Sequence, residues 1–216
     1  AMKPLIGKDT TVITCMNGIP HWYFHKLDNK YANYKIKCLD PNLLIDTILP
    51  PDNIVGSVVY PACEIVKPGT IKHIAGNRFS LGEPEGSESD RLKFISDILK
   101  RAGFRAPIQK NIRDEIWLKL IGNLSFNPIS ALTGATLEQI CNDQGTEAIV
   151  RAMMTEAKII AEELGAKINM SIEKRIDGAR KVGAHKTSML QDIEAGKPIE
   201  LDSIIIAVKE LGELTC

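Results

Sequence analysis

The spacing of apolar residues changes character about halfway along the chain. Up to residue 110, short runs rich in β-branched residues alternate with Gly, Pro and Asn, as is typical of strands joined by turns. From residue 111 onward, apolar residues recur every three or four positions over longer stretches, which indicates amphipathic helices. We therefore predict an α/β part at residues 1–110 and an all-helical part at residues 111–216.

Local signals place the elements within these two parts. The dipeptide Asn17-Gly18 ends the first apolar run, and Ser89 is placed to cap a helix. Thr146 and Ser171 are placed to cap two later helices. Strands are predicted at residues 10–16, 54–62, 70–75, 78–82 and 104–109, and helices at residues 42–49, 90–102, 112–127, 138–142, 147–164, 172–182 and 199–216.

Composition narrows the classes of function. Lys+Arg and Asp+Glu both number 27, so the chain has no long-range field that would attract nucleic acid or an anionic membrane. No apolar run reaches the length of a transmembrane helix, and no signal peptide opens the chain. The 5 cysteines are scattered and never spaced C-x-x-C, which fits a reducing cytoplasm better than a zinc site or a disulfide framework.

Two histidines have a spacing that is compatible with metal binding. His21 and His25 are four residues apart, but the residue after His21 is not the Glu of an H-E-x-x-H motif, and no third ligand is nearby in the sequence. No metal site is predicted.

Three polar side chains interrupt the most apolar helix of the second part. Residues 114–127 are apolar on most of the helix circumference, yet Lys119, Asn123 and Asn127 follow one another at spacings of four and therefore lie along one stripe. Buried amides and ammonium groups need partners, because an unpaired one costs roughly 1–3 kcal/mol. The stripe is explained equally well by bonds to main chain or a partner subunit and by a cleft that binds a small polar ligand.

A second polar cluster lies between residues 187 and 202. Pro198 suits the first turn of a helix, which also places Glu200 in that turn. An acidic side chain there complements the helix dipole, and Ser188 can serve simply as a cap, so both residues have an ordinary structural explanation.

Taken together, four segments resemble the 2-dehydropantoate 2-reductase (ketopantoate reductase) family. They are NGIP at 17–20, WLKLIGNLSFNP at 117–128, SMLQD at 188–192 and IELD at 199–202, and the similarity runs over nearly the whole chain. The resemblance implies an α/β remnant, the C-terminal part of a Rossmann-like domain. It implies that an all-helical domain of the 6-phosphogluconate-dehydrogenase C-terminal-like type follows.

The resemblance also implies a reaction, the NADPH-dependent reduction of ketopantoate to pantoate in pantothenate and coenzyme A biosynthesis. By family match, Lys119 is the general acid that protonates the nascent alkoxide. Asn123, Asn127 and Ser188 would hold the substrate, a small 2-keto acid. Asn17 and Glu200 would lie at the nicotinamide end of the cofactor.

Several features of the family are missing from this sequence. The G-x-G-x-x-G loop that holds the pyrophosphate is absent, and the acidic stretch at residues 82–86 would repel phosphate. The family's final segment and a further substrate asparagine, expected within residues 130–138, are also absent. We therefore expect a truncated form of a parent enzyme that is inactive alone, binds no NADPH and exposes apolar faces that favour homo-oligomers.

Two other functions stay open at this point. One is a related 2-keto acid, 2-hydroxy acid or opine-type dehydrogenase, in which Trp22, Tyr23 and Phe24 shape a different pocket. The other is a non-catalytic helical module that oligomerises through the Lys119 stripe.

Overall fold

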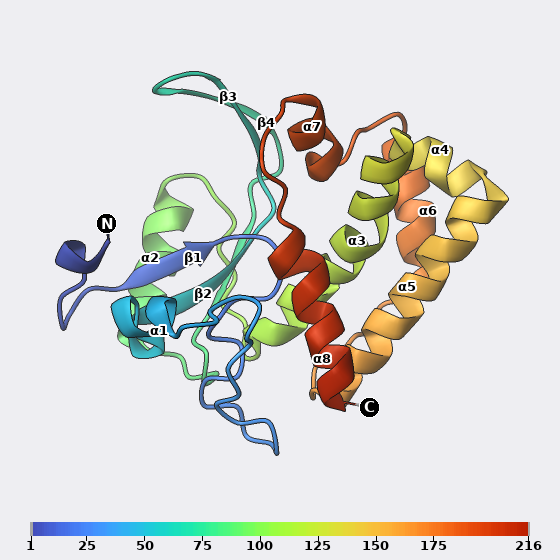
Figure 1. The fold of residues 1–216 in the computed structure, drawn as a ribbon. Coiled ribbons are helices and arrows are strands. Elements are labelled where there is room, and N and C mark those ends of the chain that lie inside the picture. Colours follow the sequence, from blue (N-terminus) through green and yellow to red (C-terminus); the bar gives the residue numbers. More distant parts are fainter. Residues whose placement is uncertain (1, 216) are drawn as a thin grey trace. The chain divides into compact units, whose positions relative to one another are not determined.

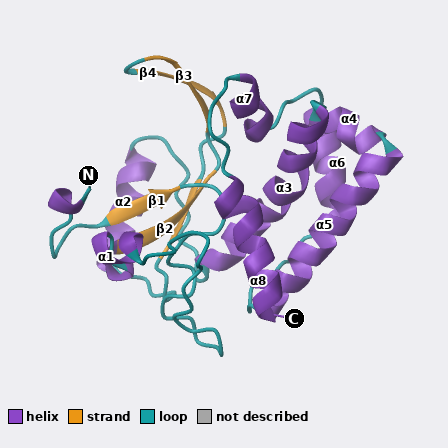
Figure 2. Ribbon diagram, in the orientation of Figure 1, coloured by secondary structure: helices purple, strands orange, loops and turns teal. Residues whose placement is uncertain are grey.

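The computed structural model describes residues 2–215, which form two compact units (Figures 1 and 2). The α/β unit comprises the chain up to Asn17 together with His21–Glu115. The helical unit comprises Gly18–Pro20 and the chain from Ile116 onward. The division falls inside one long helix, α3 (Ile112–Thr133).

The α/β unit is built on a three-stranded sheet of order β1-β2-β5. β1 (Val12–Cys15) runs parallel to β2 (Ile54–Val59), and β2 pairs antiparallel with β5 (Phe79–Gly82). The core under this sheet is formed by Val55, Leu81, Leu92 and Ala106. The remaining elements of this unit are η1 (Lys3–Leu5), α1 (Leu44–Ile48), η2 (Pro51–Asn53) and α2 (Asp90–Arg101).

The Ser89 cap is confirmed, because its hydroxyl accepts a hydrogen bond from the Leu92 N–H at 3.1 Å. The strand predicted at residues 54–62 is wrong at its end, since β2 stops at Val59. A separate strand, β3 (Ala62–Lys67), then pairs with β4 (Thr70–Ala75). This ribbon is exposed on both faces, so no alternation of apolar and polar residues marked β3 in the sequence.

The strand predicted at residues 104–109 is also wrong. The segment is extended and accepts main-chain bonds from the Phe79 and Leu81 N–H groups, but it forms only isolated bridges, one to Arg78 and one to Leu81 of β5. Pro107 lacks the N–H that a continuous ladder needs.

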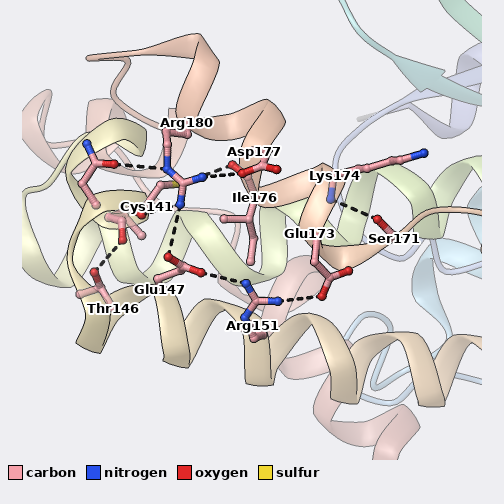
Figure 3. Close-up of polar contacts among 12 residues, drawn as sticks. Cys141, Thr146, Glu147, Arg151, Ser171, Glu173, Lys174, Ile176, Asp177 and Arg180 are labelled. Carbon is pink, nitrogen blue, oxygen red and sulfur yellow. Dashed lines mark hydrogen bonds and ion pairs between the residues drawn. The ribbon is translucent and has the colours of Figure 1, made fainter.

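The helical unit consists of short helices packed around α3 and α5 (Figure 1). They are α4 (Leu137–Asn142), α5 (Gln144–Glu163), α6 (Ile172–Val182), α7 (Ser188–Glu194), a π-helical segment η3 (Asp202–Ile206) and α8 (Ala207–Thr215). An ion-pair network joins α5 to α6 (Figure 3): Glu147 pairs with Arg151 at 2.8 Å and with Arg180 at 3.3 Å, and Arg151 reaches Glu173 at 2.8 Å.

Four helix predictions need correction. The helix predicted at residues 112–127 continues through Pro128 to Thr133. α5 begins before residue 147, because the Asp143 carboxylate, rather than Thr146, caps it. α7 was not predicted, and the Thr187 hydroxyl, rather than Ser188, caps it. The last helix begins at Leu201, so Pro198 and Glu200 precede it instead of lying in its first turn.

Two further findings concern residues 2–215. No helix there has both the length and the hydropathy to cross a membrane. None of the four cysteines among these residues, Cys15, Cys38, Cys63 and Cys141, forms a disulfide bond, whereas Cys216 lies outside the described residues.

Candidate active site

The helix α3 carries the predicted stripe, and its burial follows from its apolar faces. The Asn111 side chain accepts a hydrogen bond from the Arg113 N–H at 3.2 Å and so caps the first turn. Beyond this turn, the apolar residues that hold the helix in the helical unit are almost fully buried. They are Ile116, Trp117, Leu120, Ile121, Leu124 and Phe126.

Arg113 holds the first turn of α3 in the α/β unit. Its side chain is 5% exposed and donates to the main-chain carbonyls of Tyr23 at 2.7 Å, His25 at 2.9 Å and Pro84 at 2.5 Å. Burial lowers the pKa of this guanidinium, and the nearby Tyr23 side chain raises it in part. Sequence reasoning missed Arg113, although a charge in a largely buried helix was a signal that a partner must exist.

Glu115 attaches the first turn of α3 to the α/β unit at a second place. Its carboxylate accepts hydrogen bonds from Arg78 at 2.7 Å, from the Ser80 hydroxyl at 3.0 Å and from the Tyr60 hydroxyl at 3.1 Å. All of these partners belong to the α/β unit. Arg113 and Glu115 therefore both attach the first turn of α3 to the α/β unit.

The stripe is a mixture of half-buried and buried groups. Lys119 and Asn123 are half-buried, and Asn127 is 5% exposed. The Nδ2 atom of Asn127 is buried and has no hydrogen-bond partner among the described residues. A buried amide donor without a partner costs about 1–3 kcal/mol, which a ligand oxygen would remove.

Lys119 is electrostatically linked to Glu200. Burial lowers the pKa of the Lys119 ammonium, and the Glu200 carboxylate raises it in part. The two residues are far apart in sequence, so only the fold brings the Glu200 carboxylate close enough to influence the Lys119 ammonium. An ammonium with a lowered pKa gives up its proton more readily to an oxyanion.

We expect Lys119 to titrate below an ordinary lysine. In ¹³C-lysine NMR of this chain, its Cε resonance, assigned by its loss in Lys119→Met, should shift at a lower pH than a model lysine. Glu200→Gln should move that titration lower still, because it removes the carboxylate that raises the pKa. Glu194→Gln, which alters the carboxylate paired with Lys186, is the matched control and should leave it unchanged. A Lys119 side chain that titrates at or above the pH of an unperturbed lysine would contradict the site.

The other predicted residues lie at different places in the fold. Ser188 is the exposed first residue of α7, and Glu200 is exposed just before the last helix. Asn17 follows the carboxyl end of β1 and is half-buried in the α/β unit. Ligands of open α/β sheets bind at the carboxyl ends of strands, so the position of Asn17 suits the nicotinamide end of a dinucleotide.

The residues present fit only that end of NADPH. In residues 2–215, helices follow the strands β1 and β5, but neither strand leads into its helix through the short glycine-rich turn that receives a pyrophosphate. The helix α2 begins after the acidic stretch, and the Glu83 carboxylate there is already paired with Arg91 at 2.6 Å. Residues 2–215 therefore offer no phosphate anchor of this kind.

The described residues give no support for a metal centre. The described residues contain no cluster of three or more His, Cys, Asp or Glu side chains that could hold a metal ion. His25 pairs with Asp52 at 3.2 Å, while burial lowers the pKa of His21. The Trp22, Tyr23 and Phe24 side chains, considered as pocket residues, are buried in the core of the α/β unit instead.

Comparisons with known proteins identify the family of the chain. Residues 111–215 match the family described as "Ketopantoate reductase PanE/ApbA C terminal". The chain is 50% identical over 213 residues to the 2-dehydropantoate 2-reductase of Mesorhizobium japonicum, covering 99% of this chain and 65% of that protein.

Solved structures of similar fold indicate the same family. The fold matches a protein assigned to the ketopantoate reductases from Ralstonia solanacearum MolK2, with a TM-score of 0.94 and 39% identity over 99% of this chain and 65% of that one. It also matches the 2-dehydropantoate 2-reductase of Methylococcus capsulatus, with a TM-score of 0.81 and 28% identity over 99% and 63%. The predicted fold class is confirmed, although the chain spans only about two thirds of these relatives. On this sequence and structural evidence, the chain belongs to the ketopantoate reductase family.

Proposed function

We propose that this chain carries the substrate-binding and proton-donating half of an NADPH-dependent reductase that converts ketopantoate to pantoate, on the route to pantothenate and coenzyme A. The observation that carries the proposal is the buried, unpaired Nδ2 of Asn127 on the same stripe as Lys119. A substrate carboxylate or hydroxyl oxygen would satisfy that donor. We call a reductase of the relatives' length that contains this chain the parent reductase.

Each residue of the stripe has a role that follows from its chemistry. NADPH supplies a hydride when it is bound, and Asn17 would contact its nicotinamide end. Reduction of the 2-keto carbon leaves an alkoxide, to which the Lys119 Nζ gives a proton, so that the carbonyl becomes a hydroxyl. Asn123, Asn127 and Ser188 orient the substrate through its carboxylate and hydroxyl groups. The Glu200 carboxylate keeps Lys119 protonated until the alkoxide forms, since it raises the pKa of the ammonium.

A substrate panel on the parent reductase tests this proposal. With NADPH, we expect kcat/KM for ketopantoate to exceed that for 2-ketoisovalerate by about tenfold or more, because the latter lacks the hydroxyl that the amides would bind. Absorbance at the nicotinamide band measures both rates. A higher value for another 2-keto acid would contradict ketopantoate as substrate and favour the alternative of a related 2-keto acid dehydrogenase.

The same assay applied to this chain alone should give no turnover, and a titration with NADPH should show no measurable binding, because the described residues offer no phosphate anchor. The predicted homo-oligomer and the predicted cytoplasmic location stay predictions.

A further inference from the structure

The loop that follows β1 lies directly against the main chain of the last helix. The Ile19 N–H donates a hydrogen bond to the Ser203 carbonyl oxygen at 2.8 Å. Ile19 is fully buried, and Pro20 is buried beside it. Because of these contacts, Gly18–Pro20 belongs to the helical unit, whereas Asn17 belongs to the α/β unit.

Gly18 makes this approach possible for two independent reasons. Its φ is +83°, a backbone conformation that L side chains rarely adopt. A Cβ atom at this position would overlap the Ser203 carbonyl oxygen and would lie 2.7 Å from the Ser203 Cβ. Main-chain atoms cannot swing aside as a flexible side chain can, so any residue other than glycine must push the loop and the helix apart.

The contact falls on an unusual turn of the helix. Ser203 lies in the π-helical segment η3, where the Ala207 N–H bonds to the Asp202 carbonyl oxygen, five residues back. Such π-turns are rare and occur frequently at functional sites. Glu200 precedes Ser203 by three residues, and Asn17 precedes Gly18 by one. The contact therefore fixes the backbone of the helical unit three residues from Glu200 and next to the residue that follows Asn17.

We propose that Gly18 and the π-turn at Ser203 form a positioning contact, the loop–helix clasp, which fixes the backbone three residues from Glu200 and so positions the Glu200 carboxylate for the reaction. Neither Gly18 nor Ser203 needs to touch the substrate or the cofactor. The clasp acts by fixing the backbone next to the residues that do. This inference deepens the proposed function and rests on it.

Kinetics of the parent reductase test the clasp. We expect Gly18→Ala to lower kcat by about 10- to 100-fold, because a displacement of about 1 Å at a reacting group costs a factor of that order. The KM for NADPH should change less than about threefold, because phosphate contacts made elsewhere dominate dinucleotide binding. With 4-deuterated NADPH, the primary isotope effect on kcat should rise, since hydride transfer becomes slower than product release.

The matched control is Gly178→Ala in α6, where an added Cβ meets nothing within 4 Å. It should leave kcat and the isotope effect unchanged. A Gly18→Ala enzyme with the kcat and isotope effect of the unmodified enzyme would overturn the clasp while leaving the proposed function intact. If the unmodified parent reductase does not reduce ketopantoate, the proposed function fails, and hydrogen exchange decides the clasp.

Amide hydrogen exchange measures the clasp in this chain without any activity. The Ile19 amide should exchange slowly in the unmodified chain and in Gly178→Ala. In Gly18→Ala it should exchange about tenfold faster or more. Equal protection in all three proteins would overturn the proposal. If Gly18→Ala does not fold, the exchange rate of the Ile19 amide in the unmodified chain tests the clasp instead. Exchange as slow as that of the Ala207 amide supports the clasp, and exchange at the rate of an unprotected amide overturns it.

Discussion

Lys119→Ala is expected to lower the turnover of the parent reductase by about 10²- to 10⁴-fold, the range that loss of a positioned general acid produces. Without the ammonium, the alkoxide formed by hydride transfer has neither a proton source nor a positive charge beside it. Steady-state rates with saturating NADPH measure the loss. The remaining activity should no longer fall as the pH rises through the pKa of Lys119, because the group that loses its proton is gone.

Two further variants separate charge from proton transfer. Lys119→Arg keeps the positive charge, but a guanidinium does not release its proton in this pH range, so we expect intermediate activity. Lys181→Ala removes an exposed lysine of α6 and should retain turnover within about a factor of two. Under the alternative of a non-catalytic helical module, Lys119→Ala would instead weaken self-association, which light scattering detects. That result with normal turnover would contradict the catalytic role.

Arg113→Ala is expected to lower the free energy of unfolding of the α/β unit by roughly 3–4 kcal/mol, because two buried hydrogen bonds and one part-buried hydrogen bond from a charged donor are lost at once. Arg113→Lys should recover less than half of this loss. An ammonium on a flexible stem cannot reproduce a planar fork that serves three acceptors.

The two tryptophans allow the loss to be assigned to one unit. Trp22 is buried in the α/β unit and Trp117 in the helical unit. In a Trp117→Phe background, Trp22 fluorescence reports urea unfolding of the α/β unit. Arg101→Ala, at an exposed position of α2, is the matched control and should change the free energy by no more than about 0.5 kcal/mol. An Arg113→Ala change as small as the control would show that water replaces the guanidinium at little cost.

Local signals predicted the helices well wherever a polar cap met an amphipathic run. The bounds of α6 agree with the prediction because Ser171 accepts a hydrogen bond from the Lys174 N–H and Gly183 follows its end. α3 extends beyond its predicted end at residue 127 because tertiary packing outweighs the local cost of Pro128. A proline in a helix interior costs about 3 kcal/mol. The strand β3 was not predicted because it is exposed on both faces. Without a buried face, its sequence carries no alternation of apolar and polar residues.

The sequence by itself determined the family and the stripe, because a spacing of four residues places Lys119, Asn123 and Asn127 on one side of any α-helix. Only the tertiary structure decided which partners Lys119, Arg113 and the Ile19 N–H meet. The Glu200 carboxylate, the three carbonyls that Arg113 binds and the Ser203 carbonyl that receives Ile19 all come from segments distant in sequence. Local propensity cannot encode such partners, since long-range packing, and not the neighbouring residues, sets the distances between them.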